Sequence, residues 1–162
     1  GLVYIPANEN TCGTLEGREV TYMPGSAYIG ARSTMELLPG SDHIGEIQAW
    51  DINTGERVWT REFATSNWGG ILTTAGDVFS GGTSDRFFRA HDANTGEELW
   101  RFRTNSGVIG VPSTFSVDGK QYIAVQSGWG VDAASMTARI DMQRGTRTPV
   151  PQGGVVWVFA VP

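Results

Sequence analysis

The residues whose types and spacing could do chemistry fall first into a repeated polar motif. Asp-x-Asn-Thr-Gly occupies residues 51–55 and 92–96, and a tryptophan follows each glycine by four residues, at Trp59 and Trp100. The carboxylates of Asp51 and Asp92 could bind a hard cation. Asp and Asn side chains also cap tight turns, and Gly accepts the left-handed backbone that such turns need. We therefore expect hairpin turns, with both tryptophans packed between neighbouring sheets.

Other reactive side chains show no catalytic spacing. His43 and His91 are too far apart in the sequence to suggest a dyad, and no Ser-His-Asp order, phosphate loop or zinc pattern is present. Cys12 is the single cysteine, which excludes an internal disulfide, and we expect a packed thiol. Five acidic residues lie in predicted loops without ligand spacing, and we assign them to the solvated surface: Glu9, Glu16, Glu36, Asp42 and Asp141.

Composition excludes several classes of partner. The chain of 162 residues carries 12 basic and 17 acidic side chains, for a net charge of −5. This charge, without a Lys/Arg cluster, argues against binding to nucleic acid or to an anionic membrane surface. No apolar run approaches the length of a membrane-spanning helix. The 22 glycines and six tryptophans, with little helical periodicity, predict an all-β fold rich in turns.

The repeat predicts how these strands are grouped. The two motif copies are 41 residues apart, close to the roughly 40–50 residues of one four-stranded β-propeller blade. We predict an incomplete blade over 1–64, a full blade over 65–105 and an incomplete closing blade over 106–162. Four strands are expected in the full blade: Gly69–Thr74, Asp77–Ser80, Phe87–Asp92 and Glu98–Thr104. Insertions are expected at 7–45 and 127–154.

Both insertions fall between the second and third strands of their blades. Antiparallel strands alternate in direction, so both insertions and the interblade segment Thr65–Gly70 must lie at one end of the sheets. The two Asp-x-Asn-Thr-Gly turns must lie at the other end. Short turns on one side and elaborated loops on the other predict a binding face at the end that carries the insertions.

An ordered series of motifs on this face resembles a known family. Residues 67–79, which begin Asn-Trp-Gly-Gly, are followed by Gly-Thr-Ser-Asp at 82–85. Together they are similar to the W-G-G-x-L-x-T-A-G-x-x-F…G-T-x-D segment of alcohol dehydrogenases that depend on pyrroloquinoline quinone (PQQ). Pro6-Ala7-Asn8, with Cys12 downstream, resembles the P-x-N-x-x-C stretch of the methanol and ethanol dehydrogenase branch, although Cys12 comes one residue late.

The resemblance implies the C-terminal portion of an eight-bladed β-propeller, whose remaining blades would precede this chain. In that family PQQ lies in a central funnel beside a Ca²⁺ or lanthanide ion. A primary alcohol is oxidised to an aldehyde as hydride passes to PQQ, and electrons leave to a cytochrome c. The resemblance therefore implies a periplasmic enzyme with a small alcohol as substrate.

The resemblance matches four positions of this sequence to residues that contact the cofactor in the family. Asn8 matches an asparagine that hydrogen-bonds the quinone, and Trp68 matches a tryptophan at the cofactor edge. Val131 and Asp132 occupy positions where relatives have Gly followed by Trp or Ala. Their backbone could approach the quinone, while the Asp132 carboxylate would turn away from an anionic cofactor. Nothing in this sequence matches the catalytic aspartate or the metal ligands of the family.

An alternative is a non-enzymatic propeller built from PQQ-like repeats, which would serve as a scaffold for protein interactions. Such proteins share the turn followed by tryptophan, so that motif does not discriminate. Trp68-Gly69-Gly70, Asn8 and the two insertions favour the enzyme. A sugar-binding propeller would account only for the aromatic residues, most of which we assign to the core.

Overall fold

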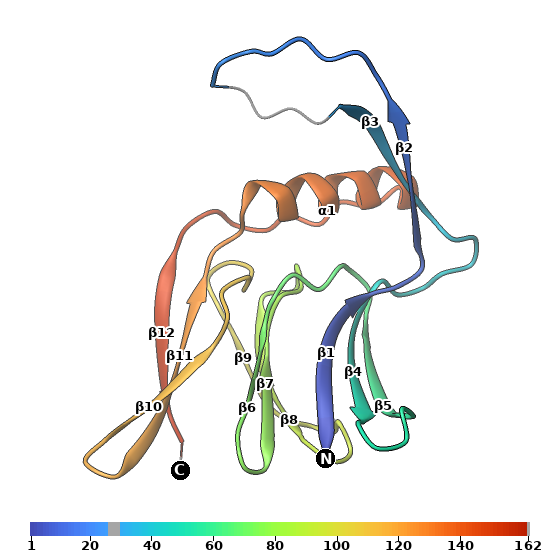
Figure 1. Cartoon of the computed structure of the whole chain (residues 1–162). Helices are drawn as coiled ribbons and strands as arrows, with labels where there is room; N and C mark the ends of the chain where they lie inside the picture. Colours follow the sequence, from blue (N-terminus) through green and yellow to red (C-terminus); the bar gives the residue numbers. More distant parts are fainter. Residues whose placement is uncertain (26–29, 162) are drawn as a thin grey trace.

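A computed structural model describes residues 1–25 and 30–161 and shows a chain made mostly of β-strands (Figure 1). Three antiparallel sheets stand side by side with their strands running lengthwise. Residues 26–29, inside the predicted insertion 7–45, and Pro162, the last residue of the predicted closing blade, lie outside the described residues.

The central sheet has four strands, each paired with the next strand along the chain. They are β6 (Ile71–Thr73), β7 (Asp77–Ser80), β8 (Phe87–Asp92) and β9 (Glu98–Arg103). The strands predicted at Asp77–Ser80 and Phe87–Asp92 coincide with β7 and β8. The first strand is shorter than predicted because the chain before Ile71 lies against the Gly81–Gly82 backbone instead, where Trp68 N–H donates to Gly82 O over 2.8 Å.

Each flanking sheet has three strands. One sheet has the order β1-β4-β5, formed by β1 (Leu2–Asn8), β4 (Gly45–Asp51) and β5 (Arg57–Phe63). The other has the order β10-β11-β12, formed by β10 (Ser113–Val117), β11 (Lys120–Ser127) and β12 (Val155–Ala160). A buried apolar cluster lies between this second sheet and the central one, and contains Phe79, Phe88, Ala90, Val108, Ile123 and Val125.

Regular structure occurs where the sequence was expected to form elaborated loops. The connection from β1 to β4 holds the hairpin β2 (Thr11–Gly17) and β3 (Ala31–Leu37), and the connection from β11 to β12 holds helix α1 (Val131–Arg144). Sequence analysis missed the helix because its buried stripe consists of Ala133, Thr137 and Ile140, of which two are small or polar. The spacing of that stripe and the left-handed Gly145 that ends the helix are signals for it.

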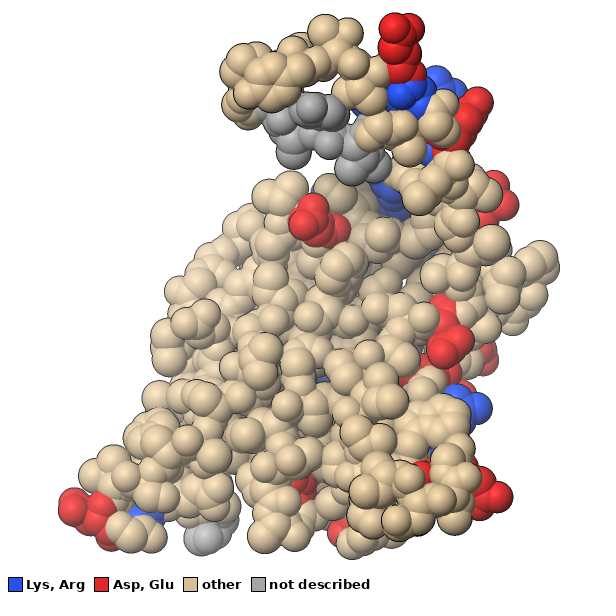
Figure 2. Space-filling view, in the orientation of Figure 1, with Lys and Arg blue, Asp and Glu red and all other residues tan. Residues whose placement is uncertain are grey.

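The two ends of the sheets differ, as alternating strand directions require. The β2–β3 hairpin and α1 lie at the upper end in Figure 1, and the β4–β5, β6–β7, β8–β9 and β10–β11 turns lie at the lower end. Charged side chains cluster over the β2–β3 hairpin and along the lower and right-hand margins, whereas the middle of the visible face is largely uncharged (Figure 2). Within the described residues, no helix combines the length and the apolar character needed to cross a bilayer.

The repeated motif forms capped turns, as predicted. The Asp92 carboxylate accepts the backbone N–H groups of Asn94 and Thr95 over 2.9 and 2.8 Å. Asp51 accepts the N–H of Asn53 over 2.7 Å in the same way. These backbone hydrogen bonds lower the pKa of both carboxyl groups, the bond from Thr95 having the largest effect at Asp92.

The turn at residues 92–96 also contacts side chains of the neighbouring sheet. Trp59 of β5 donates its indole N–H to Ala93 O over 3.0 Å, and the Tyr4 hydroxyl of β1 donates to the same oxygen over 3.0 Å. The Trp59 ring lies against Gly96, where an added Cβ would come within 2.6 Å of ring atom Cε3. Gly96 is therefore needed twice, for its φ of +71° and for the close approach of the ring.

Replacing Gly96 by Ala tests this double requirement. Gly119→Ala is the matched control, because Gly119 has a φ of +76° and open space around its Cβ position. We expect Gly119→Ala to cost about 1–2 kcal/mol through backbone strain alone. Gly96→Ala should cost about 1–3 kcal/mol more, because it also displaces Trp59. Urea unfolding followed by tryptophan fluorescence measures both changes, and equal losses would show that the ring contact contributes nothing.

Candidate functional site

Two of the four residues predicted to contact a cofactor lie together at the seam between two sheets. Asn8 is the last residue of β1, and Trp68 lies in the connection from β5 to β6. Both lie at the upper end of the sheets, which also carries the hairpin and the helix (Figure 1). Residue Asn67 joins them, because it contacts Asn8 directly and precedes Trp68.

The side chain of Asn8 is held by the backbone of Asn67. Its Oδ1 accepts the Asn67 N–H over 2.7 Å, and its Nδ2 donates to Asn67 O over 3.1 Å. A primary amide has two N–H donors and two acceptor lone pairs. One of each is used here, so one N–H and one lone pair remain on an exposed side chain. Asn8 thus presents an oriented hydrogen-bonding group at the surface of the seam.

The backbone at Trp68 is fixed by close contacts with glycines. Trp68 N–H donates to Gly82 O over 2.8 Å. Gly82 has a φ of +114°, and a Cβ there would lie 2.0 Å from Gly69 N. The Trp68 ring is half-buried, and its indole N–H is covered without an acceptor among the described residues. A buried donor without a partner is costly, and because this chain's own atoms already cover the N–H, a ligand would meet the exposed part of the ring instead.

Val131 and Asp132 have a different environment from the other two predicted residues. They are the first two residues of α1, and the Val131 side chain is 82% exposed. An acidic residue in the first turn stabilises a helix through the dipole, which gives Asp132 a structural role. Among the described residues, no hydrogen bond joins Val131 or Asp132 to Asn8 or Trp68.

The opposite end of α1 contacts the neighbourhood of Trp68. Arg144 donates to Ala64 O, four residues before Trp68, and Gln143 donates to Met35 O in β3 over 2.8 Å. At a rise of about 1.5 Å per residue, Val131 lies about 20 Å from Arg144 along the helix axis. The helix therefore links the Trp68 connection to the β2–β3 hairpin through its last turn.

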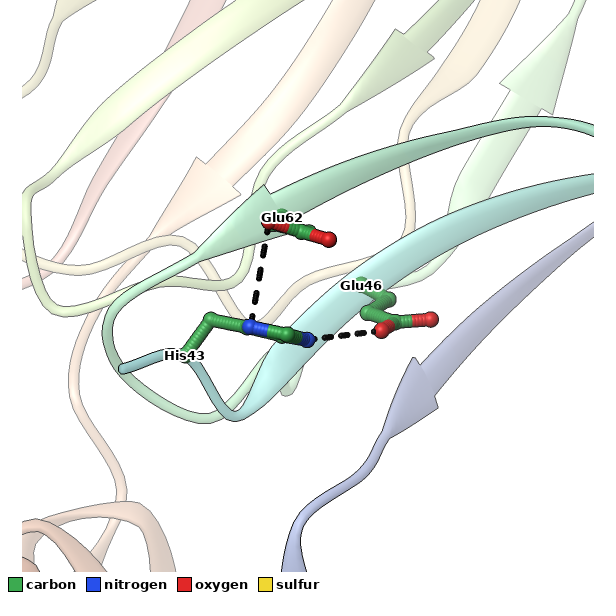
Figure 3. Close-up of side chains that lie close together, drawn as sticks. All are labelled: His43, Glu46 and Glu62. Atoms are coloured by element: carbon green, nitrogen blue, oxygen red, sulfur yellow. Dashed lines mark hydrogen bonds and ion pairs between the residues drawn. The ribbon is translucent and has the colours of Figure 1, made fainter. Parts of the chain in front are cut away.

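A cluster around His43 was missed by sequence analysis. Figure 3 shows Glu46 and Glu62 joined to different nitrogens of the His43 ring. Nε2 lies 2.9 Å from Glu46 Oε1, and Nδ1 lies 2.8 Å from Asp42 Oδ1 and 3.7 Å from Glu62 Oε2. Glu46 is buried and also accepts from Gln48 Nε2 over 2.6 Å. Asp42-His43-x-x-Glu46 in the sequence was a signal for this cluster.

The cluster is arranged for a charged histidine. Hydrogen bonding to Asp42, followed by contributions from Glu46 and Glu62, raises the pKa of His43, against the opposing effect of its burial. The carboxylates of Glu46 and Glu62 are hydrogen-bonded or ion-paired to different ring nitrogens, although one ligand atom from each of the three residues lies within 4.8 Å of the others. An imidazolium with a proton on each nitrogen satisfies both carboxylates.

Cys12 differs from its prediction. It lies in β2, opposite Glu36 in β3, and is exposed rather than packed. The described residues leave this thiol at the surface of the β2–β3 hairpin.

Comparison with known proteins agrees with the resemblance noted in the sequence. Residues 60–123 match the family described as the β-propeller domain of glucose/ethanol/alcohol dehydrogenase. The whole chain is 40% identical to quinoprotein alcohol dehydrogenase PedE of Pseudomonas putida, over 25% of that protein. A lanthanide-dependent methanol dehydrogenase of Methylorubrum extorquens is 45% identical over 80% of this chain and 22% of its own length. The chain belongs to the PQQ-dependent (quinoprotein) alcohol dehydrogenase family.

The fold comparison leads to the same family. A solved structure described as a europium-containing methanol dehydrogenase superposes on 99% of this chain with a TM-score of 0.81 and 35% identity. The alignment covers 31% of that structure. The fold is thus that of a β-propeller, and this chain spans about a quarter of the length of the curated relatives it matches.

The residues at the seam fit the cofactor of this family. PQQ is flat, anionic and rich in carbonyl and carboxylate acceptors. Asn8 has an N–H donor to spare, and the half-buried Trp68 indole offers a broad apolar edge.

Removing the His43 ring tests the charged cluster. Because the folded-state pKa is raised above the unfolded value of about 6.5, the stabilisation is complete below that value and disappears as pH rises through the folded-state pKa. The stability advantage of the wild type over His43→Gln should therefore be larger at about pH 5 than at about pH 9. Urea unfolding at both pH values measures it, and an advantage that grows with pH would contradict an imidazolium.

Proposed function

We propose that this chain forms part of the PQQ pocket of an enzyme that oxidises a primary alcohol to an aldehyde. The observation that carries the proposal is the arrangement of Asn8, Asn67 and Trp68 at the seam. There an oriented amide and a half-buried indole lie at the end of the sheets that carries the insertions. Membership of a family of quinoprotein alcohol dehydrogenases supports it.

Each residue of the seam has a distinct task in this proposal. Asn8 donates its free N–H to an acceptor on the edge of the cofactor, and Trp68 covers that edge with an apolar ring and excludes water from it. Bound PQQ supplies the quinone that accepts hydride from the alcohol. Val131 and Asp132 contribute backbone at the rim of the pocket from the first turn of α1.

The remaining parts of the reaction are assigned to the rest of the protein. We place the base that accepts the alcohol proton, and the ligands of a Ca²⁺ or lanthanide ion, outside this chain. Two similar proteins, a lanthanide-dependent methanol dehydrogenase and a europium-containing one, support such an ion. A periplasmic location and transfer of electrons to a cytochrome c complete the proposal. The scaffold alternative leaves the oriented Asn8 amide without a task.

Cofactor-dependent oxidation tests the proposal in the whole protein. The apoprotein is titrated with PQQ in the presence of Ca²⁺ or La³⁺, and reduction of an artificial dye is followed with methanol and with ethanol. We expect saturable PQQ binding and dye reduction that requires both cofactor and metal. The absence of PQQ-dependent reduction across small alcohols and aldehydes would favour the scaffold.

Truncation of Asn8 tests the role of its amide. Loss of one hydrogen bond to an anionic acceptor should weaken PQQ binding about tenfold in Asn8→Ala. Asn53→Ala is the control, because the Asn53 side chain is exposed in the turn at the opposite end of the sheets. Quenching of tryptophan fluorescence by PQQ gives both affinities. Equal binding by the wild type and Asn8→Ala would remove Asn8 from the pocket.

A further inference from the structure

We infer that Asn67 is a positioning residue that fixes the orientation of the Asn8 amide toward the cofactor. This inference rests on the proposed function and assigns a task to a residue that sequence analysis did not single out. Asn67 itself is 5% exposed and has no surface to offer a ligand, so it acts through Asn8.

The contact between the two residues permits one orientation of the Asn8 amide. The Asn67 N–H faces Asn8 Oδ1, and Asn67 O faces Asn8 Nδ2. A flipped amide would place NH₂ against N–H and oxygen against oxygen, which replaces two hydrogen bonds by two repulsive contacts. The backbone of Asn67 thereby decides which atoms of Asn8 remain free for a ligand.

The backbone of Asn67 is in turn held by its own side chain. Nδ2 donates to Glu46 O in β4 over 3.1 Å, and Oδ1 accepts the Gly69 N–H over 3.3 Å. The bond to Glu46 attaches the connection at residues 65–70 to β4, the strand that pairs with β1, and the bond from Gly69 is internal to the connection. Asn8 and Glu46 lie on the paired strands β1 and β4. The Asn67 side chain and the Asn8 amide are therefore both held by the same sheet.

Two glycines keep Asn67 in this position. A Cβ at Gly45 would lie 2.8 Å from Asn67 N, and a Cβ at Gly82 would lie 2.3 Å from Asn67 Oδ1. The residue is thus enclosed by backbone on two sides, which leaves its side chain little freedom to adopt another rotamer. A change at Asn67 should therefore release the connection and, with it, the orientation of Asn8.

A double-mutant cycle in the whole protein tests the inference. Asn67→Ala, Asn8→Ala and the double variant are titrated with PQQ, and affinity is measured by quenching of tryptophan fluorescence. We expect each single variant to lose about tenfold in affinity, and the double variant to lose little more than Asn8→Ala alone. The absorption maximum of bound PQQ should shift in the same direction in both single variants. If Asn67→Ala does not fold, Asn67→Ser, which keeps one hydroxyl, replaces it in the cycle.

A matched control separates positioning from general loosening of the connection. The Ser84 hydroxyl donates to Thr65 Oγ1 over 2.9 Å, at the start of the same connection, and within the described residues neither side chain hydrogen-bonds to Asn8. Ser84→Ala should lower thermal stability and leave PQQ affinity and spectrum unchanged. Two outcomes would overturn the positioning role alone. In one, the losses of affinity of the two single variants multiply in the double variant; in the other, Ser84→Ala loses as much affinity as Asn67→Ala. A wild type that does not bind PQQ would overturn the proposed function and this inference together.

Discussion

The contact of Trp59 with the turn at residues 92–96 is the interaction on which the rest of this structure depends. The turn closes the β8–β9 hairpin through the Asp92 cap and at the same time accepts hydrogen bonds from the neighbouring sheet at Ala93 O. Arg61 of β5 also donates to Gly96 O, so three side chains of one sheet meet this turn of the next. One polar motif therefore ends a strand and also fixes the position of the neighbouring sheet.

Sheet packing at the lower end has a consequence at the upper end. Asn8 belongs to one sheet, and Asn67 and Trp68 belong to the connection that leads into the next, so their contact exists only if the two sheets have the correct relative position. Close backbone approaches at Gly45 and Gly82 make this seam tight. The candidate site thus depends on how the two sheets pack. The buried Asn67 connects Asn8 of one sheet with the segment that carries Trp68.

Sequence analysis predicted the elements that follow local rules. The turns at 51–55 and 92–96 depend on short-range capping by Asp51 and Asp92, and β7 and β8 follow from the alternation around them. The His43 cluster was missed because Glu46 and Glu62 come from two paired strands, and only their register brings them to the same ring. Helix α1 was missed because its buried face is small, and Cys12 was misassigned because it lies on an exposed face of the β2–β3 hairpin.

The sequence by itself determined the repeat, the turn chemistry, the family and the end of the sheets that carries the long insertions, because these depend on residue types, spacing and strand direction. The tertiary structure decided which side chains meet there. It brought Asn8 to Asn67, placed Val131 and Asp132 at the start of a helix, and arranged carboxylates on both sides of His43. The hydrogen bonds between Asn8 and Asn67 join residues 59 positions apart. They form only when the two sheets pack correctly, and the spacing of residues along the chain does not show that packing.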